Sequence, residues 1–137
     1  TVFAEEILSY FSIKQYFDSV VGSNLDGTRV AKTEIINYIL NQYNHPKEDF
    51  VMIGDRKHDI IGATNNGIDS IGVLYGYGSY EEITTASPTM IAHSVEELHS
   101  QLLATWPPPL KDTKSTYRKR RFIQSKSTQR PLLLRIL

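Results

Sequence analysis

Two acidic residues stand where a parallel α/β sheet would bind a ligand. The short apolar run Phe50–Ile53 predicts a strand that is buried on both faces, and Gly54 and Asp55 follow it directly. Asp59 comes four residues after Asp55, in the expected first turn of a helix. Because open α/β sheets bind ligands beyond the carboxyl ends of their strands, the two carboxylates can converge on one crevice. Paired hard oxygen ligands at such a place suit Mg²⁺ together with a phosphate ester.

A structural role for the same carboxylates is the alternative. Aspartate is common before or within a first helical turn, because it caps free amide groups and suits the positive end of the helix dipole. The spacing of Asp55 and Asp59 therefore leaves both a metal site and a helix cap open, and it does not name a reaction.

Lys32 is the third residue that could take part in this chemistry. It falls in the first turn of a helix expected over about residues 30–43, where a cation forgoes the roughly 0.3–1 kcal/mol that is available to an anion. An anion docked beside the lysine would explain the position, whereas a solvated lysine would simply tolerate the penalty. Lys32, Asp55 and Asp59 are all predicted at helix starts on the same edge of the sheet, which favours a shared ligand site.

Other chemistry-bearing patterns are weak. Residues 76–81 half-match a dinucleotide-binding fingerprint, but Glu81 replaces the third glycine, so a structural turn is favoured over a loop that binds phosphate. The four histidines lack metal-ligand spacing, and His58 is interpreted as a surface residue. The sequence contains no serine-hydrolase elbow and no P-loop.

The elements that must position these residues alternate along the chain. The residues after Asp59 predict a helix that stops at Gly67, and Ser79 with Glu82 and Ser94 with Glu97 predict capping boxes for two later helices. A further helix is expected over 1–11, with an apolar face, and the expected strands cover 16–21, 50–53, 70–74 and 89–92. This alternation with short connections predicts a parallel α/β sheet.

The composition fits one globular domain with an appended segment. The chain has 137 residues, of which 40% are hydrophobic and 22% charged, and it has no cysteine for disulfides or thiolate chemistry. No apolar run approaches the ~18 residues of a membrane span and no signal peptide is present, so a cytoplasmic location is expected.

The net charge of zero conceals two different compositions. Residues 106–137 carry nine Lys and Arg against one Asp, whereas residues 1–105 carry six against fourteen Asp and Glu. Trp106 and the prolines at 107–109 end the periodic pattern, which predicts a domain over 1–105 and a basic, disordered tail over 106–137. The run 118–121 could bind phosphates or an acidic surface, but a solvated tail is the more usual interpretation and nucleic-acid binding is not favoured.

With these residues in place, the sequence resembles the haloacid dehalogenase superfamily of phosphatases, and most closely its phosphoglycolate phosphatase and 5′-nucleotidase-like branch. The resemblance covers residues 1 to about 104 and is carried by four segments, at 16–23, 26–32, 51–63 and 67–78. It implies that Lys32 balances charge on the nucleophile and the transferred phosphoryl group, that Asp55 ligates Mg²⁺, and that Asp59 assists at the metal directly or through water. The family reaction passes through an aspartyl-phosphate, whose charge the lysine and Mg²⁺ offset.

The resemblance also implies what the sequence lacks. The family's Asp-x-Asp-x-Thr/Val motif, its Ser/Thr phosphate-binding motif and its helical cap do not occur. The implied fold is a partial Rossmann-like parallel sheet with flanking helices, without the first two core strands and the cap. Those strands would lie between the strands at 16–21 and 50–54, so we expect open sheet edges, with poor stability, self-association or pairing with a complementing polypeptide.

The expected function is therefore that of a Mg²⁺-dependent phosphomonoesterase that is inactive as this chain alone. Its substrate would be a small phosphorylated metabolite, such as phosphoglycolate or a nucleoside monophosphate. The alternative is a non-catalytic binding protein whose basic tail contacts an acidic partner. A receiver-type signalling domain fits less well, because its lysine should follow the carboxylates and Lys32 precedes them.

Overall fold

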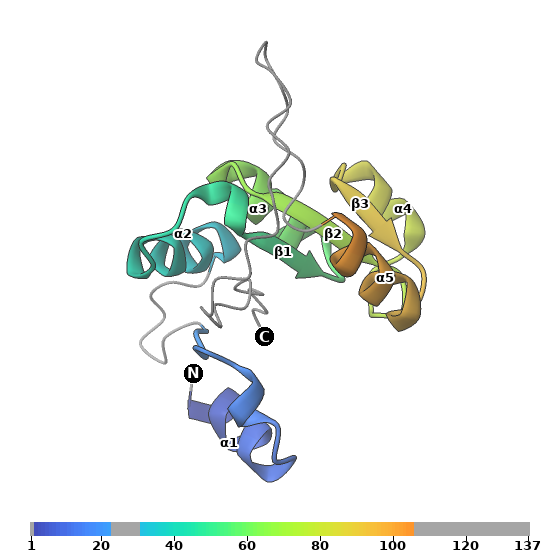
Figure 1. Ribbon diagram of the computed structural model, residues 1–137. Coiled ribbons are helices and arrows are strands. Elements are labelled where there is room, and N and C mark those ends of the chain that lie inside the picture. The colour runs from blue at the N-terminus through green and yellow to red at the C-terminus, as the bar shows by residue number, and fades with distance from the viewer. Residues whose placement is uncertain (1, 23–30, 106–137) are drawn as a thin grey trace.

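Three parallel strands form the centre of the molecule in the order β1-β2-β3 (Figure 1). The computed structural model describes residues 2–22 and 31–105, so the predicted tail over 106–137 lies outside the described residues. The strands are β1 (Val51–Gly54), β2 (Asp69–Val73) and β3 (Met90–Ala92). The prediction of a partial parallel α/β sheet is confirmed, and the strands expected over 50–53, 70–74 and 89–92 are each formed within one residue of those bounds.

Helices flank this sheet and connect its strands. Five α-helices occur among the described residues, together with two short 3₁₀ turns: α1 (Val2–Tyr10), η1 (Lys14–Tyr16), α2 (Lys32–Gln42), η2 (Lys47–Asp49), α3 (Lys57–Asn66), α4 (Tyr80–Thr85) and α5 (Val95–Thr105). Gly67 ends α3 with φ 67°, the left-handed conformation that glycine adopts without strain, so the predicted glycine stop is confirmed. Among the described residues, no helix is both long and apolar enough to cross a membrane.

Phe50 and the residues of β1 that follow it alternate between two hydrophobic cores, one on each face of the sheet. Phe50 and Met52 pack with the apolar residues of α2 and α3, whereas Val51 packs with residues of β2, β3 and α5. Phe50, Val51 and Met52 are all fully buried. Because successive side chains of a strand point to opposite faces, an uninterrupted apolar run marks a strand that is covered on both sides.

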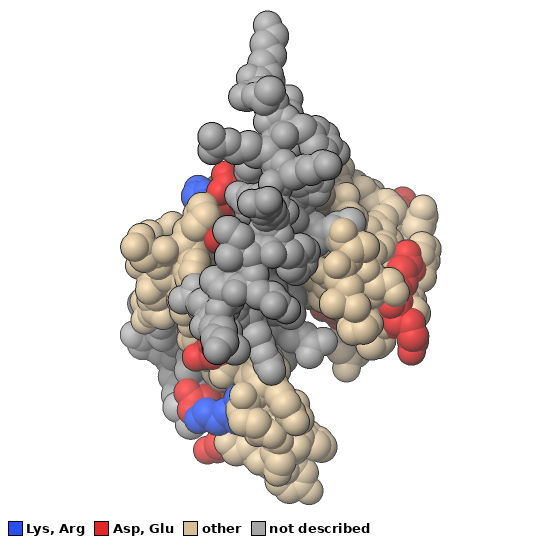
Figure 2. Space-filling model, in the orientation of Figure 1, with Lys and Arg blue, Asp and Glu red and all other residues tan. Residues whose placement is uncertain are grey.

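Acidic side chains gather at one end of the sheet. Glu81 and Glu82 lie in the first turn of α4, and Glu96 and Glu97 lie in the first turn of α5. Figure 2 shows acidic side chains on the side of the molecule where α5 lies. Carboxylates in a first helical turn are favoured by the helix dipole, which contributes to the stability of both helices.

The strand predicted over residues 16–21 is wrong. Lys14–Tyr16 forms the turn η1, and residues 17–22 follow as irregular chain, although Phe17 has extended dihedral angles. A strand requires a hydrogen-bonded neighbour, and among the described residues no strand pairs with this segment. Val21 nevertheless packs against the core formed by α2 and β1.

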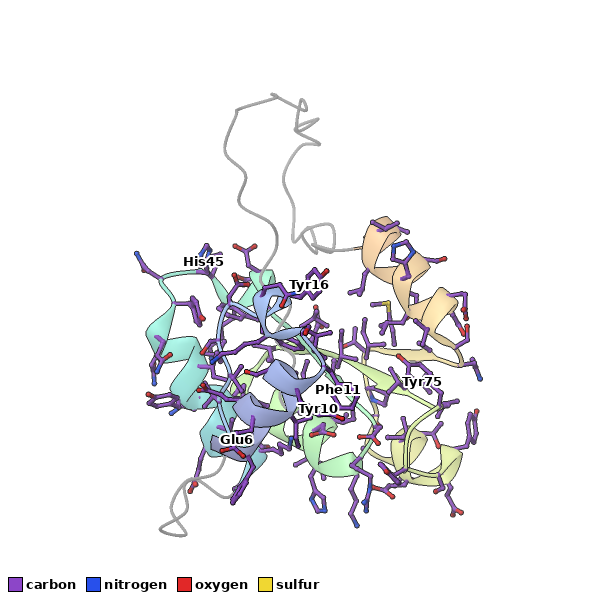
Figure 3. All side chains as sticks on the ribbon, turned by 90° about the horizontal axis from the view of Figure 1, so that it is seen from below. Glu6, Tyr10, Phe11, Tyr16, His45 and Tyr75 are labelled. Atoms are coloured by element: carbon purple, nitrogen blue, oxygen red, sulfur yellow. The ribbon has the colours of Figure 1, made fainter. Side chains whose placement is uncertain are left out.

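Helix α1 stands apart from the layered body, and Figure 1 shows it below the sheet. Its predicted apolar face is only partly covered. Leu8 is 3% exposed, but Phe3, Ile7 and Phe11 are each more than half exposed. Figure 3 shows Tyr10 and Phe11 at the end of α1, Tyr16 on the following turn, and Tyr75 in the separate loop between β2 and α4.

Candidate functional site

Two of the three predicted site residues form an ion pair. Lys32 is the first residue of α2 and Asp59 lies in the first turn of α3, and the Nζ of Lys32 lies 3.2 Å from the Oδ1 of Asp59. The Asp59 side chain is only 6% exposed, and the Lys32 side chain is 26% exposed. A buried carboxylate needs such a partner, because an unpaired buried charge is strongly destabilising.

The other carboxylate oxygen of Asp59 is also engaged. The backbone N–H of Arg56 donates to Asp59 Oδ2 at 3.2 Å, which closes the first turn of α3. Asp59 therefore caps the first turn of α3, which is the structural role that the sequence left open, and it also pairs with Lys32. Gly54 makes this approach possible, since a β-carbon at that position would overlap the Asp59 side chain.

Asp55 lies at the carboxyl end of β1 and is half-buried. Its Oδ2 accepts a hydrogen bond of 2.8 Å from the backbone N–H of Tyr77, in the loop between β2 and α4. β-carbons on Gly76 and Gly78 would overlap the side chain and the backbone of Asp55, respectively. The loop that half-matches a dinucleotide fingerprint therefore turns around Asp55. This close packing explains why Gly76 and Gly78 are glycines, in agreement with the prediction of a structural turn.

Glu82 is a further residue of this region whose part the sequence did not indicate. Its Oε1 accepts hydrogen bonds from Arg56 Nε at 2.9 Å and from the backbone N–H of Lys57 at 3.0 Å. These bonds, that of the Lys57 amide first, lower the pKa of Glu82, and the Glu82 carboxylate raises the pKa of Arg56. The predicted capping box is half formed, because Ser79 caps α4 through the N–H of Glu82 while the Glu82 carboxylate turns to α3.

The oxygen atoms around this edge partly fit a magnesium ion. Within the described residues the Oδ1 of Asp55 has no hydrogen-bond partner, so it could ligate a cation that keeps several of its waters. Both oxygens of Asp59 are occupied, which suits contact with a metal through water better than direct ligation. The described part of the chain holds no group of three or more His, Asp or Glu residues that could bind a metal by themselves.

An open pocket of about 330 Å³ lies beside Lys32. Its walls include Thr33 on α2 and His58 and Ile61 on α3. His58 is exposed, in agreement with its interpretation as a surface residue. Lys32 thus lines an open pocket while its ammonium group pairs with a buried carboxylate.

Comparison with known proteins identifies the family. The family described as HAD-hydrolase-like matches residues 28–98, which include Lys32, Asp55 and Asp59. The chain belongs to this family, and its sheet with flanking helices is a partial fold of the haloacid dehalogenase type.

Individual relatives carry phosphatase names. A 5′-nucleotidase of Pseudomonas aeruginosa is 46% identical over 64% of this chain and 40% of its own length, and a phosphoglycolate phosphatase of Vibrio parahaemolyticus is 32% identical over 70% and 42%. A solved structure described as a predicted phosphatase from Clostridium acetobutylicum is 48% identical with a TM-score of 0.73, over 75% of this chain and 48% of that one. The tyrosine-protein kinase PtkA of Mycobacterium tuberculosis is 38% identical over 72% and 35%. The chain thus spans less than half the length of each of these proteins.

Proposed function

We propose that this chain contributes the lysine and the metal-binding carboxylate to a Mg²⁺-dependent phosphomonoesterase. The observation that carries the proposal is the contact between Lys32 and Asp59. It lies at the carboxyl end of the sheet, as Asp55 does, in a chain of the HAD-hydrolase-like family. A fixed cation next to a metal-binding carboxylate is the pairing that phosphoryl transfer requires, because negative charge spreads over the phosphoryl oxygens in the transition state.

Each residue has a distinct part in this proposal. The Oδ1 of Asp55 would ligate Mg²⁺, which neutralises phosphoryl charge when it is bound. Asp59 would orient the Lys32 ammonium and hold a metal-bound water. Lys32 would then direct a positive charge toward the phosphate ester from the border of the pocket that it shares with His58.

The names of two relatives support a substrate class. Proteins called 5′-nucleotidase and phosphoglycolate phosphatase are both similar to this chain, so we propose a small phosphate monoester of one of these two kinds. The sequence contains no Asp-x-Asp motif to supply the nucleophile. We therefore propose that activity requires a further segment that carries such a motif, on this or another polypeptide. The edge of β1 that faces away from β2 is a place for its strand, since no strand pairs there within the described residues.

The test is hydrolysis of p-nitrophenyl phosphate by the purified chain with Mg²⁺. We expect no turnover by the chain alone, and turnover once a polypeptide with the Asp-x-Asp motif is added. The restored activity should be lost with Lys32→Ala and with Asp55→Asn, whereas His99→Ala, at an exposed position on α5, should retain it. Turnover by the chain alone that these two substitutions abolish would refute the requirement for a partner. Restored activity that both substitutions leave intact would refute the proposed site.

The alternative of a non-catalytic binding protein concerns residues 106–137, outside the described residues, and it stays a prediction. Its basis is the excess of nine Lys and Arg over one Asp in that segment. Binding to an acidic partner through these charges should weaken steeply with salt and should vanish when the segment is deleted. Binding that is insensitive to both changes would exclude it.

A further inference from the structure

The side chain of Asn66, on α3, is hydrogen-bonded to the first turn of α2. This side chain is buried, with the residue 8% exposed. The Nδ2 group donates one hydrogen bond to the carbonyl oxygen of Thr33 at 3.0 Å and a second to the carbonyl oxygen of Gly62 at 2.8 Å. Because an amide nitrogen has two N–H groups, both of its donors are used. The bond to Gly62 stays within α3, whereas the bond to Thr33 reaches the residue that follows Lys32.

Gly62 allows the two helices to approach at the same place. A β-carbon at Gly62 would lie 3.0 Å from Ile36 Cδ1, 3.1 Å from Lys32 Cβ and 3.2 Å from the carbonyl carbon of Lys32. These separations are tighter than ordinary contacts between carbon atoms, so an alanine at this position would require its neighbours on α2, which include the Lys32 main chain, to give by a few tenths of an ångström. Gly62 also lies three residues after Asp59, which places it on the same side of α3 as that carboxylate.

The position of the Lys32 backbone is therefore fixed by two contacts that do not involve its own charge. Asn66 holds the carbonyl of the next residue, and Gly62 leaves room for the Lys32 main chain. From this position the ammonium group reaches the Oδ1 of Asp59 at 3.2 Å. A small outward shift of α2 would lengthen an ion pair that is already near the limit of a hydrogen bond.

We propose that Asn66 and Gly62 are positioning residues that set the contact between Lys32 and Asp59. The importance of this contact for phosphoryl chemistry rests on the proposed function, but the positioning itself does not. Neither residue touches the pocket beside Lys32, so each acts only through the placement of α2.

The test is the rate at which individual lysines react with an acylating reagent, measured by mass spectrometry on the intact chain. Asp59→Asn gives the rate of Lys32 without its partner. We expect Asn66→Ala and Gly62→Ala each to raise the Lys32 rate by about threefold or more toward that reference, because the ammonium group, on a side chain that is 26% exposed, becomes more accessible to the reagent once it leaves Asp59. Lys57, which is exposed on α3, should react at an unchanged rate.

Asn65→Ala is the matched control. Asn65 also reaches Thr33, but through the hydroxyl group and at an exposed position, so its loss should leave the Lys32 rate unchanged. A general rise in all lysine rates together with a loss of circular dichroism would show unfolding in Asn66→Ala, and Gly62→Ala then decides the question, because alanine favours the helix. The proposal is wrong if the Lys32 rate stays at the parent value in Gly62→Ala, or if Asp59→Asn does not change it. An absence of phosphatase activity would leave the labelling result unaffected.

Discussion

The Glu82 carboxylate links α4 to the start of α3 through two hydrogen bonds. The sequence pattern assigned it to the cap of its own helix, α4, but it binds the Arg56 guanidinium and the Lys57 amide at the start of α3. Hydrogen bonds between charged groups are stronger than those to a neutral amide, so the guanidinium competes well with the local amide. Arg56 directly follows Asp55, and Glu82 thereby helps to hold the turn that presents Asp55, the proposed Mg²⁺ ligand.

This contact predicts a pH-dependent contribution to stability. The folded-state pKa of Glu82 lies below the ordinary value of 4.5, so its contribution is fully present above that value and is lost as the pH falls through the folded-state pKa. Glu82→Gln should therefore lower the melting temperature at neutral pH. The difference from the parent chain should shrink as the pH falls below 4.5, since protonation removes the same charge.

Glu81→Gln is the matched control for this experiment. Glu81 lies next to Glu82 in the first turn of α4 but is exposed. Thermal melts of the three proteins across this pH range measure the effect. A Glu82→Gln difference that stays constant with pH, or one that Glu81→Gln reproduces, would contradict the assignment.

At the scale of elements, α4 packs directly on β2 at Gly72. A β-carbon on this residue would overlap the Ile83 side chain and would lie 3.3 Å from Pro88 Cγ. Gly72→Ala should therefore destabilise the chain by about 1–3 kcal/mol, the usual cost of overpacking a core. Urea titration of the free energy of unfolding measures this cost.

The double substitution with Ile83→Ala identifies the cause. Removal of the Ile83 branch makes room for the new methyl group, so Gly72→Ala should cost less in that background than in the parent chain. Equal costs in both backgrounds would place the strain somewhere other than the contact between α4 and β2.

The sequence correctly predicts those elements whose structure is determined by residues close to them in the chain. The apolar run before Gly54 and the glycine stop at Gly67 each specify their structure within a few residues, and both are formed. The strand at 16–21 has suitable residues but needs a partner, which its own sequence cannot supply. Long-range contacts of the site could not be predicted for the same reason. Their positions at helix starts indicated Lys32 and Asp59. The hydrogen bonds from Tyr77 to Asp55 and from Asn66 to Thr33, however, join segments 22 and 33 residues apart.

At the scale of the whole molecule, two surfaces lack partners within the described residues. One is the edge of β1 that faces away from β2, and the other is the apolar face of α1 with Phe3, Ile7 and Phe11. Unpaired strand edges and exposed apolar side chains both favour association. We therefore predict that the isolated chain has an apparent mass that rises with concentration in sedimentation equilibrium, and that it melts over a broad range.

A polypeptide that supplies the missing strand should reverse both effects. In its presence the complex should reach one defined mass, and the melt should become sharper, because binding stabilises the folded state. A chain that stays monomeric at every concentration and melts in one sharp cooperative transition would contradict this prediction.

The strand β1 is covered above and below by packed side chains, but its hydrogen-bonding groups are satisfied by a strand on one flank only within the described residues. A segment that pairs with the other side of β1 would bind to a strand that is already formed, and β1 would set the direction and register of the new strand. If that segment belongs to a separate chain, dilution should slow completion of the sheet, since the two pieces must collide. If it belongs to the same chain, completion should proceed at a rate that dilution does not change.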